Sequence, residues 1–349
     1  LRWHSPALPG LARQLRCRMI DCYYRRLDAE GGLQRFESTE GTGSNWDTSI
    51  QHGSPPLALL TKVIEELAAG RGMQVGRLTL DILGAIPVAP VAVRAWVSRP
   101  GSRICMITSE MTATQPDGSE RAVARMSAWL IATSDTRDAV LDRYPPMPRV
   151  ADTGFRHSWQ GRPGYLETVT WVPQPDDAGA SVVWLEPLIS LVDDEELTDL
   201  QRLAMVVDSA NGVGATLDPN QFTFMNTDTT VHLHRAPVGS EFCLRARGSI
   251  GPDGSPMISA PSITLRNWRI LPGQPIVCMT ASVSSDIART GRPCDLFRCS
   301  MKCRARSGIS SRRSSSAGTA IGTTFRRSKS SCRNRPAAIS AGSARVVEE

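Results

Sequence analysis

The stretch that decides the fold spans residues 51–70 and reads QHGSPPLALLTKVIEELAAG. Its two prolines suit the first turn of a helix, where backbone N–H groups lack intrahelical partners in any case. Apolar residues then recur along one face, and Gly70 and Gly72 mark the end. We therefore expect an amphipathic helix over residues 55–69. Its apolar positions are Leu57, Leu59, Leu60, Val63, Ile64 and Leu67.

Four runs rich in β-forming residues follow this helix. They cover residues 77–83, 91–98, 104–113 and 122–133, and Pro- or Gly-containing turns separate them. Alternating character between such turns is typical of strands joined as an antiparallel meander. The first half of the chain is thus predicted to be one helix followed by an antiparallel sheet.

The same order of elements recurs beyond a Pro-rich bridge at residues 144–148. The layout of residues 77–95 resembles that of 228–246, and a repeat of about 100 residues indicates a duplicated domain rather than a solenoid. Two unrelated α+β segments that share turn residues are the alternative. In the second half we expect strands at 165–171 and 181–186, a helix at 199–210, and strands at 224–235 and 241–249.

Charge is unevenly distributed along the chain. Residues 263–349 contain 16 Lys and Arg against 4 Asp and Glu, and the whole chain has a net charge of +6, so residues 1–262 carry a net charge of −6. A basic protein is a candidate for binding nucleic acid or an anionic membrane. Here only the tail is basic, so a nucleic-acid partner is not expected for the body.

Cysteine usage and the N-terminal sequence favour a reducing compartment. The chain has nine cysteines, and the four in the body (Cys17, Cys22, Cys105 and Cys243) are irregularly spaced, which does not resemble a secreted disulfide framework. Residues 1–18 lack the apolar core of a signal peptide, and no apolar window is long enough for a membrane span. We therefore expect a cytoplasmic protein.

Several strings resemble the TesB-like acyl-CoA thioesterases of the actinobacterial type. They lie at residues 46–56, 77–96, 200–211 and 224–237, in the order that the family has them. The resemblance implies an α+β fold, a tandem (double) hotdog in which each half is a long helix wrapped by an antiparallel β-sheet. It also implies a role in lipid metabolism, with an acyl-CoA substrate, hydrolysis to fatty acid and CoA, and no cofactor. Hotdog halves commonly pair further, so a homodimer would fit.

The resemblance divides the chain into four parts. Residues 1–18 are interpreted as a disordered extension or a start-site artefact, 19–150 as the N-terminal hotdog, and 151–262 as an incomplete C-terminal hotdog. Residues 263–349 form a Ser/Arg/Cys-rich tail without convincing strand period after about Ile276. A shifted reading frame explains this tail, and a natural disordered basic tail is the alternative.

Asp208 is the main candidate for catalysis. It follows an apolar run at the end of the second-half helix, where a carboxylate could act as a general base or could simply bond the helix end. The family has a matching aspartate that helps to activate the attacking water. Its polar partner on the next strand falls at or beside Asn226 and Thr227, which could also be a strand-edge polar pair. The family's third residue, a glutamine on the closing strand, has no matching position here.

Substrate binding is assigned to His52, Gly53 and Asn211. His52 and Gly53 precede the first helix, whose backbone N–H groups and positive dipole end could polarise an acyl carbonyl. We expect the backbone to matter more than the imidazole, which could be a simple loop residue. The family usually has Gly-Gly after the histidine, whereas this chain has Gly53-Ser54.

Other chemistry has little support in the sequence. Thr230, His232 and His234 share one strand face and a His-x-His pair can bind metal, but no third ligand is evident, so no metal is predicted. There is no G-x-S-x-G elbow, P-loop or dinucleotide fingerprint. The alternative to a thioesterase is a catalytically silent module that binds acyl-CoA or an acyl carrier.

Overall fold

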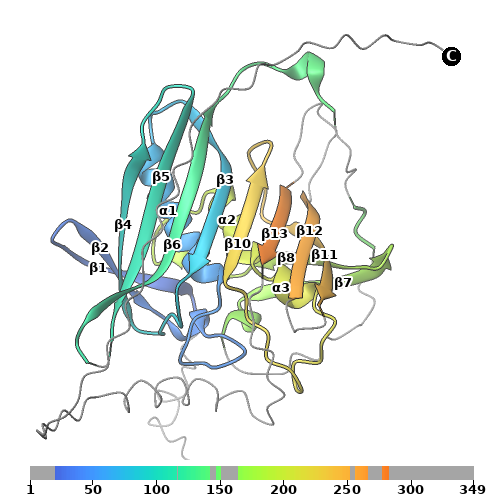
Figure 1. Cartoon of the computed structure of the whole chain (residues 1–349), viewed down its shortest axis with the longest axis horizontal. Coiled ribbons are helices and arrows are strands. Elements are labelled where there is room, and N and C mark those ends of the chain that lie inside the picture. The colour runs from blue at the N-terminus through green and yellow to red at the C-terminus, as the bar shows by residue number, and fades with distance from the viewer. Residues whose placement is uncertain are drawn as a thin grey trace, which may run out of the picture. The chain divides into compact units, whose positions relative to one another are not determined.

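The computed structural model describes most of the body of the chain (Figure 1). All described residues belong to the compact unit formed by residues 1–300. The expected extension at 1–18 and most of the tail lie outside the described residues. The described residues are 20–115, 117–141, 147–150, 164–251, 256–265 and 277–282.

The first half contains the predicted helix and meander, preceded by a hairpin. Helix α1 begins at Ser54, and all the expected apolar positions except the half-buried Leu67 are buried. It ends before Gly70, whose φ of +75° is disfavoured for other residues. The hairpin β1–β2 was not predicted from the sequence. The elements are β1 (Cys22–Glu30), β2 (Leu33–Ser38), α1 (Ser54–Ala68), β3 (Met73–Ile82), β4 (Pro90–Arg99), β5 (Ile104–Thr114) and β6 (Glu120–Ala132).

The second half has the same sequence of elements with shorter helices. Tyr165 opens a 3-10 turn, so the strand expected at 165–171 begins later, at Val169. The helix expected at 199–210 is interrupted at Asp208, because the Ser209 N–H bonds the carbonyl three residues back, Val206, at 3.1 Å. The elements are β7 (Val169–Asp177), β8 (Ala180–Pro187), β9 (Ser190–Val192), α2 (Asp199–Val207), α3 (Ala210–Val213), β10 (Asp228–Leu233), β11 (Phe242–Ile250), β12 (Pro256–Leu265) and β13 (Val277–Ser282).

The strands form one sheet whose order repeats. The first half reads β1-β2-β4-β5-β6-β3, and the second half reads β7-β8-β11-β12-β13-β10. Corresponding strands β3 and β10 pair antiparallel, with Thr79 opposite Thr230 and Leu80 opposite Thr229. The two halves therefore meet as two copies of one unit would across a two-fold axis. Short strand β9 pairs parallel with β1 at the sheet edge.

The strands β12 and β13 correct one expectation. The sequence indicated that the second half ends before its sheet closes, yet residues 256–265 and 277–282 pair with each other and with β11 and β10. Strand β13 contains the β-formers Val277 and Thr280, and pairing uses the backbone, so a short run suffices without long alternation. Strand β12 also crosses the expected domain limit at 262. The domain limits themselves stay predictions.

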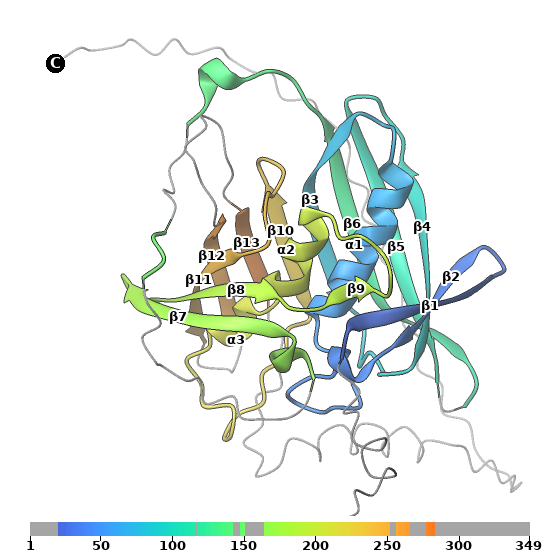
Figure 2. The ribbon, with the colours of Figure 1, turned by 180° about the vertical axis from the view of Figure 1, so that it is seen from behind.

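Helices α1 and α2 pack against each other on one face of the sheet (Figure 2). Their buried side chains join those of both sheet halves in one hydrophobic core. Burial of apolar side chains stabilises the folded arrangement by about 25 cal/mol for each Å² of apolar surface removed from water. In this packing the C-terminal end of α2 lies next to the N-terminal end of α1, where the candidate site lies.

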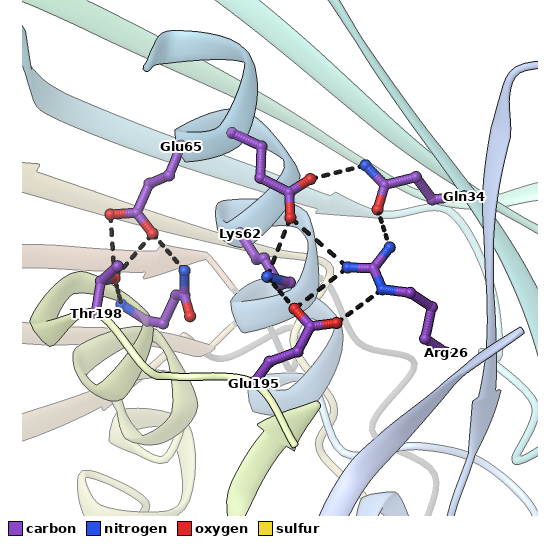
Figure 3. A network of polar contacts seen from close by, with 8 residues as sticks. Arg26, Gln34, Lys62, Glu65, Glu195 and Thr198 are labelled. Carbon is purple, nitrogen blue, oxygen red and sulfur yellow. Dashed lines mark hydrogen bonds and ion pairs between the residues drawn. The ribbon is translucent and has the colours of Figure 1, made fainter. Parts of the chain in front are cut away.

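Polar contacts hold the opposite ends of the two helices (Figure 3). Glu65, near the C-terminus of α1, accepts hydrogen bonds from Thr198 Oγ1 at 2.8 Å and from Gln201 Nε2 at 2.8 Å. Thr198 also caps α2 by accepting from the Gln201 N–H. Burial raises the pKa of Glu65 and outweighs these hydrogen bonds, which lower it.

An ion-pair network lies beside this contact (Figure 3). The Lys62 ammonium is 2.6 Å from Glu195 and 3.0 Å from Glu66, and Arg26 Nε donates to Glu195 at 2.7 Å. Burial alone would raise the pKa of Glu195, but the bonds from Arg26 and Lys62 outweigh it and lower that pKa. The network ties the loop before α2 to helix α1 and strand β1.

Candidate active site

Asp208 lies just past the C-terminus of α2 and is buried, with 3% of its surface exposed. A carboxylate at the C-terminus of its own helix faces the negative end of that helix dipole. The opposing helix compensates, because the carboxylate points at the N-terminus of α1, whose dipole end is positive. Packing of α2 on α1 thus places one buried anion where a helix start favours it.

One oxygen of the carboxylate is saturated with hydrogen bonds. Asp208 Oδ1 accepts from Thr229 Oγ1 at 2.5 Å and from Asn226 Nδ2 at 2.7 Å. Asn226 Nδ2 also donates to Thr229 Oγ1 at 3.1 Å, which closes a triangle of polar groups. Charge-assisted bonds of this kind are short and fix the carboxylate plane.

The second oxygen, Oδ2, faces the first half of the chain. Within the described part of the structure no hydrogen bond to Oδ2 is present. A Cβ atom built on Gly53 would lie 2.3 Å from Oδ2 and 2.8 Å from Cγ, so a side chain at this position would force the Asp208 carboxylate to move. Oδ2 is therefore an anionic oxygen available to accept a hydrogen bond from water at the start of α1.

His52 lies beside this oxygen without forming an ion pair. Its Nδ1 is 4.0 Å from Asp208 Oδ2, and it accepts a hydrogen bond from the Ser54 N–H at 3.1 Å. Burial lowers the pKa of His52 to about 4, against a smaller opposing effect of Asp208. The imidazole is thus neutral at physiological pH, and its Nδ1 carries no proton to share with the carboxylate.

Tyr165 connects the two halves of the site. Its ring stacks on His52, with centroids 3.8 Å apart and planes 6° apart. Its hydroxyl donates to the Met205 carbonyl at 2.9 Å and shares a 2.7 Å hydrogen bond with Ser209, the neighbour of Asp208. Burial raises the pKa of this phenol, so it stays protonated.

A tight backbone approach fixes the position of Tyr165. Its N–H donates to the Gly43 carbonyl at 2.9 Å. Gly164 has a φ of +143°, and a Cβ there would lie 2.5 Å from that same carbonyl oxygen. Glycine at 164 thus allows the backbone to approach Gly43 closely and so places Tyr165 in the site.

The structure brings four of the six predicted site residues together: Asp208, Asn226, His52 and Gly53. The Thr227 hydroxyl instead donates to its neighbour Asp228 at 3.2 Å, and its carbonyl accepts from the Ile82 N–H. Thr227 therefore holds the start of β10 against β3.

Asn211 lies one turn after Asp208, whose carbonyl accepts from the Asn211 N–H at 3.2 Å. The Asn211 Oδ1 atom is buried without a hydrogen-bond partner among the described residues. The residue borders a small pocket with a largely apolar lining, which places it near but not within the Asp208 cluster. The lining is Asn211, Ala215, Thr216, Leu217, Phe224, Gly248 and Ile250.

Sequence reasoning missed Thr229, Tyr165 and Ser209. Thr229 shares a buried strand face with Val231 and Leu233, so period-two alternation from those residues identifies it. Tyr165 and Ser209 carry no comparable signal. His232 in β10 and His234 just after its end are both exposed, and no group of three potential metal ligands occurs among the residues that the structure describes.

Family models match most of the described chain. The model for the acyl-CoA thioesterase N-terminal domain matches residues 42–131, and the model for the C-terminal domain matches residues 119–259. The chain belongs to the acyl-CoA thioesterase family. Gly53 lies in the region matched by the N-terminal domain model, and Asp208 lies in the region matched by the C-terminal domain model. No curated protein matches the sequence significantly.

Solved structures show the fold of this thioesterase-family chain. A protein of unknown function with a hot dog fold from Alicyclobacillus acidocaldarius is 15% identical, with a TM-score of 0.55, over 76% of this chain and 96% of that one. The tesB protein of Mycobacterium avium subsp. paratuberculosis is 11% identical, with a TM-score of 0.52, over 75% and 95% of the two chains.

A third similar structure is the acyl-CoA thioesterase II TesB2 of Mycobacterium marinum. It is 11% identical, with a TM-score of 0.50, over 75% of this chain and 96% of that one. At such identities the likeness shows the hotdog fold. The family models confirm the resemblance to acyl-CoA thioesterases noted in the sequence. In the described part of the chain, no helix has both the length and the apolar character to cross a membrane.

Proposed function

We propose that this chain is a double hotdog enzyme that hydrolyses acyl-CoA to a fatty acid and CoA. The observation that carries the proposal is the state of the Asp208 carboxylate. One of its oxygens is fixed by Thr229 and Asn226, and the other faces the start of α1 without a hydrogen bond among the described residues. A held carboxylate with one open oxygen is suited to orient and deprotonate a water molecule.

The reaction would run in two steps on this geometry. Water bound to Asp208 Oδ2 attacks the thioester carbon, its oxygen forms the new C–O bond, and its proton passes to Asp208. The tetrahedral intermediate then collapses as the C–S bond breaks, and Asp208 returns the proton to the departing CoA sulfur. No cofactor takes part in either step.

The double hotdog is supported by the repeated strand order and by the separate matches to N- and C-terminal thioesterase domains. Each half supplies one side of the site, since Gly53 comes from the first and Asp208 from the second. A cytoplasmic setting, a part in lipid metabolism and pairing into a homodimer belong to the same proposal. Sedimentation of the full chain would test the homodimer.

Thiol release from acyl-CoAs of several chain lengths tests the proposed reaction. Asp208→Asn keeps the shape of the side chain but removes its negative charge, so kcat should fall by about a hundredfold or more. Asp28→Asn, an exposed carboxylate on β1, is the matched control and should keep the wild-type rate. An unchanged kcat in Asp208→Asn would refute the assigned role.

A second candidate function is a module that binds acyl-CoA or an acyl carrier without cleaving it. The observation that favours it is the sequence of β13, Val277–Ser282, which contains no glutamine where the family has one on its closing strand. Calorimetric binding of an acyl-CoA together with no thiol release would identify this alternative. Thiol release that depends on Asp208 would exclude it.

A further inference from the structure

The first turn of α1 offers unusually few backbone donors. Pro55 and Pro56 have no N–H, and the Leu57 N–H is bonded to the Gly53 carbonyl at 3.1 Å. Only the N–H groups of Gly53 and Ser54 remain at this helix start. An ordinary helix N-terminus presents four free N–H groups, so the usual way to stabilise an oxyanion is restricted here.

One of the two remaining donors is already used. The Ser54 N–H donates to His52 Nδ1 at 3.1 Å. An imidazole nitrogen that accepts a hydrogen bond carries no proton, so the ring proton lies on Nε2. The same bond therefore removes a backbone donor and creates a side-chain donor on the opposite edge of the ring.

The imidazole is held in a fixed orientation. Tyr165 stacks on its face at 3.8 Å, and Tyr165 is itself anchored to the end of α2 through Met205 and Ser209. The backbone N–H of His52 also donates to the Thr42 carbonyl, at 2.8 Å. The side chain keeps 15% of its surface exposed, and no hydrogen bond of Nε2 is present among the described residues. The Nε2 edge is thus a positioned donor that a ligand can reach.

We propose that His52 donates a hydrogen bond from Nε2 to the carbonyl oxygen of the thioester, together with the Gly53 N–H, and so stabilises the oxyanion of the tetrahedral intermediate. This role rests on the proposed function. The Gly53 N–H has no hydrogen-bond partner in the described residues, and Gly53 is also the residue against which Asp208 lies. The attacking water and the carbonyl oxygen would then be held from the same short loop.

A neutral imidazole suits this role. A protonated ring next to Asp208 would form an ion pair with the carboxylate and compete with water for Oδ2. Burial lowers the pKa of His52 to about 4, so the ring stays neutral and donates without pairing. Neutral imidazole can act as the electrophile towards a carbonyl oxygen in this manner.

Two substitutions separate the donor from the ring. His52→Phe keeps an aromatic ring over Tyr165 but removes both nitrogens, so kcat should fall by about a hundredfold or more, with KM changed by less than about threefold. His52→Gln places an amide N–H near the position of Nε2, so about tenfold of this loss should be recovered. A kcat like that of the wild type in His52→Phe would overturn the proposal.

Nitrogen NMR tests the same proposal without turnover. The full chain has five histidines, so it can be labelled with ¹⁵N-histidine and the His52 signals identified by their loss in His52→Gln. At pH 7 we expect the neutral tautomer with the proton on Nε2. Protonation of Nδ1, or of both nitrogens, would overturn the assignment whatever the activity of the chain.

Two CoA analogues then test whether the carbonyl oxygen of the bound ligand lies next to His52 Nε2. An S-(2-oxoalkyl)-CoA, which has a ketone oxygen near the reacting position, should shift the Nε2 signal, whereas an S-alkyl-CoA without a carbonyl should leave it in place. An equal response to both, or no response to bound ketone, would overturn the His52 role. Loss of thiol release in Asp208→Asn would still stand in that case, so the two proposals fail separately.

Discussion

The carboxylate of Asp208 lies so close to Gly53 that a Cβ atom at position 53 would be 2.3 Å from Oδ2. This contact joins the end of α2 to the start of α1, and thereby the second half of the chain to the first. It also leaves no room for a side chain between the carboxylate and the start of α1. The space in which we place the attacking water depends on this absence of a side chain.

Gly53→Ala should therefore displace Asp208 and lower kcat by about a hundredfold, since a misplacement of about 1 Å costs that much in a catalytic group. Gly32→Ala is the control, because no atom lies within 4 Å of its Cβ position in the β1–β2 turn. The control should lose about 1 kcal/mol of stability through its positive φ but keep its kcat. Equal kcat losses in both variants would contradict the prediction, because the loss in Gly53→Ala would then not come from displacement of Asp208.

Thr229 and Thr230 form a matched pair for testing the polar triangle. Thr229 is buried and donates to Asp208, whereas Thr230 lies on the opposite face of β10 with its hydroxyl 3.4 Å from that of Thr79. Thr229→Val should lower kcat by about tenfold to a hundredfold, because a hydrogen bond to a charged group is worth about 1.5–3 kcal/mol. Thr230→Val should change kcat by less than about twofold. Steady-state thiol release from both variants checks the difference.

The first half of the fold was predictable because its sequence signals agree with each other. The Pro-Pro helix start, the apolar face of α1 and the turn residues between β3 and β6 all indicate the same elements, and the structure confirms them. Hairpin β1–β2 was missed because Arg, Asp, Glu and Gln are frequent in it. Its buried residues Tyr23, Tyr24 and Phe36 show that tertiary packing, not local propensity, selects strand there.

The site was only partly predictable for a related reason. Asp208 and Gly53 were identified from the resemblance, but their contact joins residues 155 positions apart and depends on how α2 packs on α1. Tyr165 was missed because its role is to stack on His52 and to bond Ser209, which no local pattern encodes. Thr229 was missed by two positions, although the alternation of Val231 and Leu233 places it on the buried face.

Partly buried His52 should make the stability of the protein depend on pH. The pKa of its side chain is about 4 in the folded state and about 6.5 when unfolded, so the unfolded chain binds a proton first as the pH falls. Stability from this group is fully present above about pH 6.5 and decreases towards pH 4, by about 3 kcal/mol in total. Urea unfolding between pH 7 and pH 4 would measure this slope.

His52→Gln is the control for that slope, because glutamine does not titrate. The difference in unfolding free energy between wild type and His52→Gln should change with pH by up to about 1.4 kcal/mol for each pH unit below 6.5. Parallel curves for the two proteins would mean that His52 is exposed to protonation in the folded state. That outcome would also contradict a neutral imidazole in the site.

The network at the other end of the helices should contribute to stability rather than to catalysis. The Lys62 side chain is 10% exposed and bridges Glu195 and Glu66, so Lys62→Met leaves Glu195, which is 27% exposed, paired with Arg26 but no longer with Lys62. We expect a loss of about 1–2 kcal/mol in unfolding free energy with kcat retained. Arg25→Met removes exposed ion pairs with Asp21 and Asp193, and it should cost much less stability than Lys62→Met because solvent screens exposed pairs.

A double-mutant cycle separates the pair from other effects of Lys62. Glu195→Gln alone and with Lys62→Met completes the cycle, and the double variant should lose less stability than the sum of the two single losses, because both single changes remove the same Lys62–Glu195 ion pair. Additive losses would show that Lys62 acts through its aliphatic stem packed on α1 and not through Glu195. A drop in kcat in any of these variants would mean that the network also controls the spacing of α1 and α2, and through it the position of Asp208.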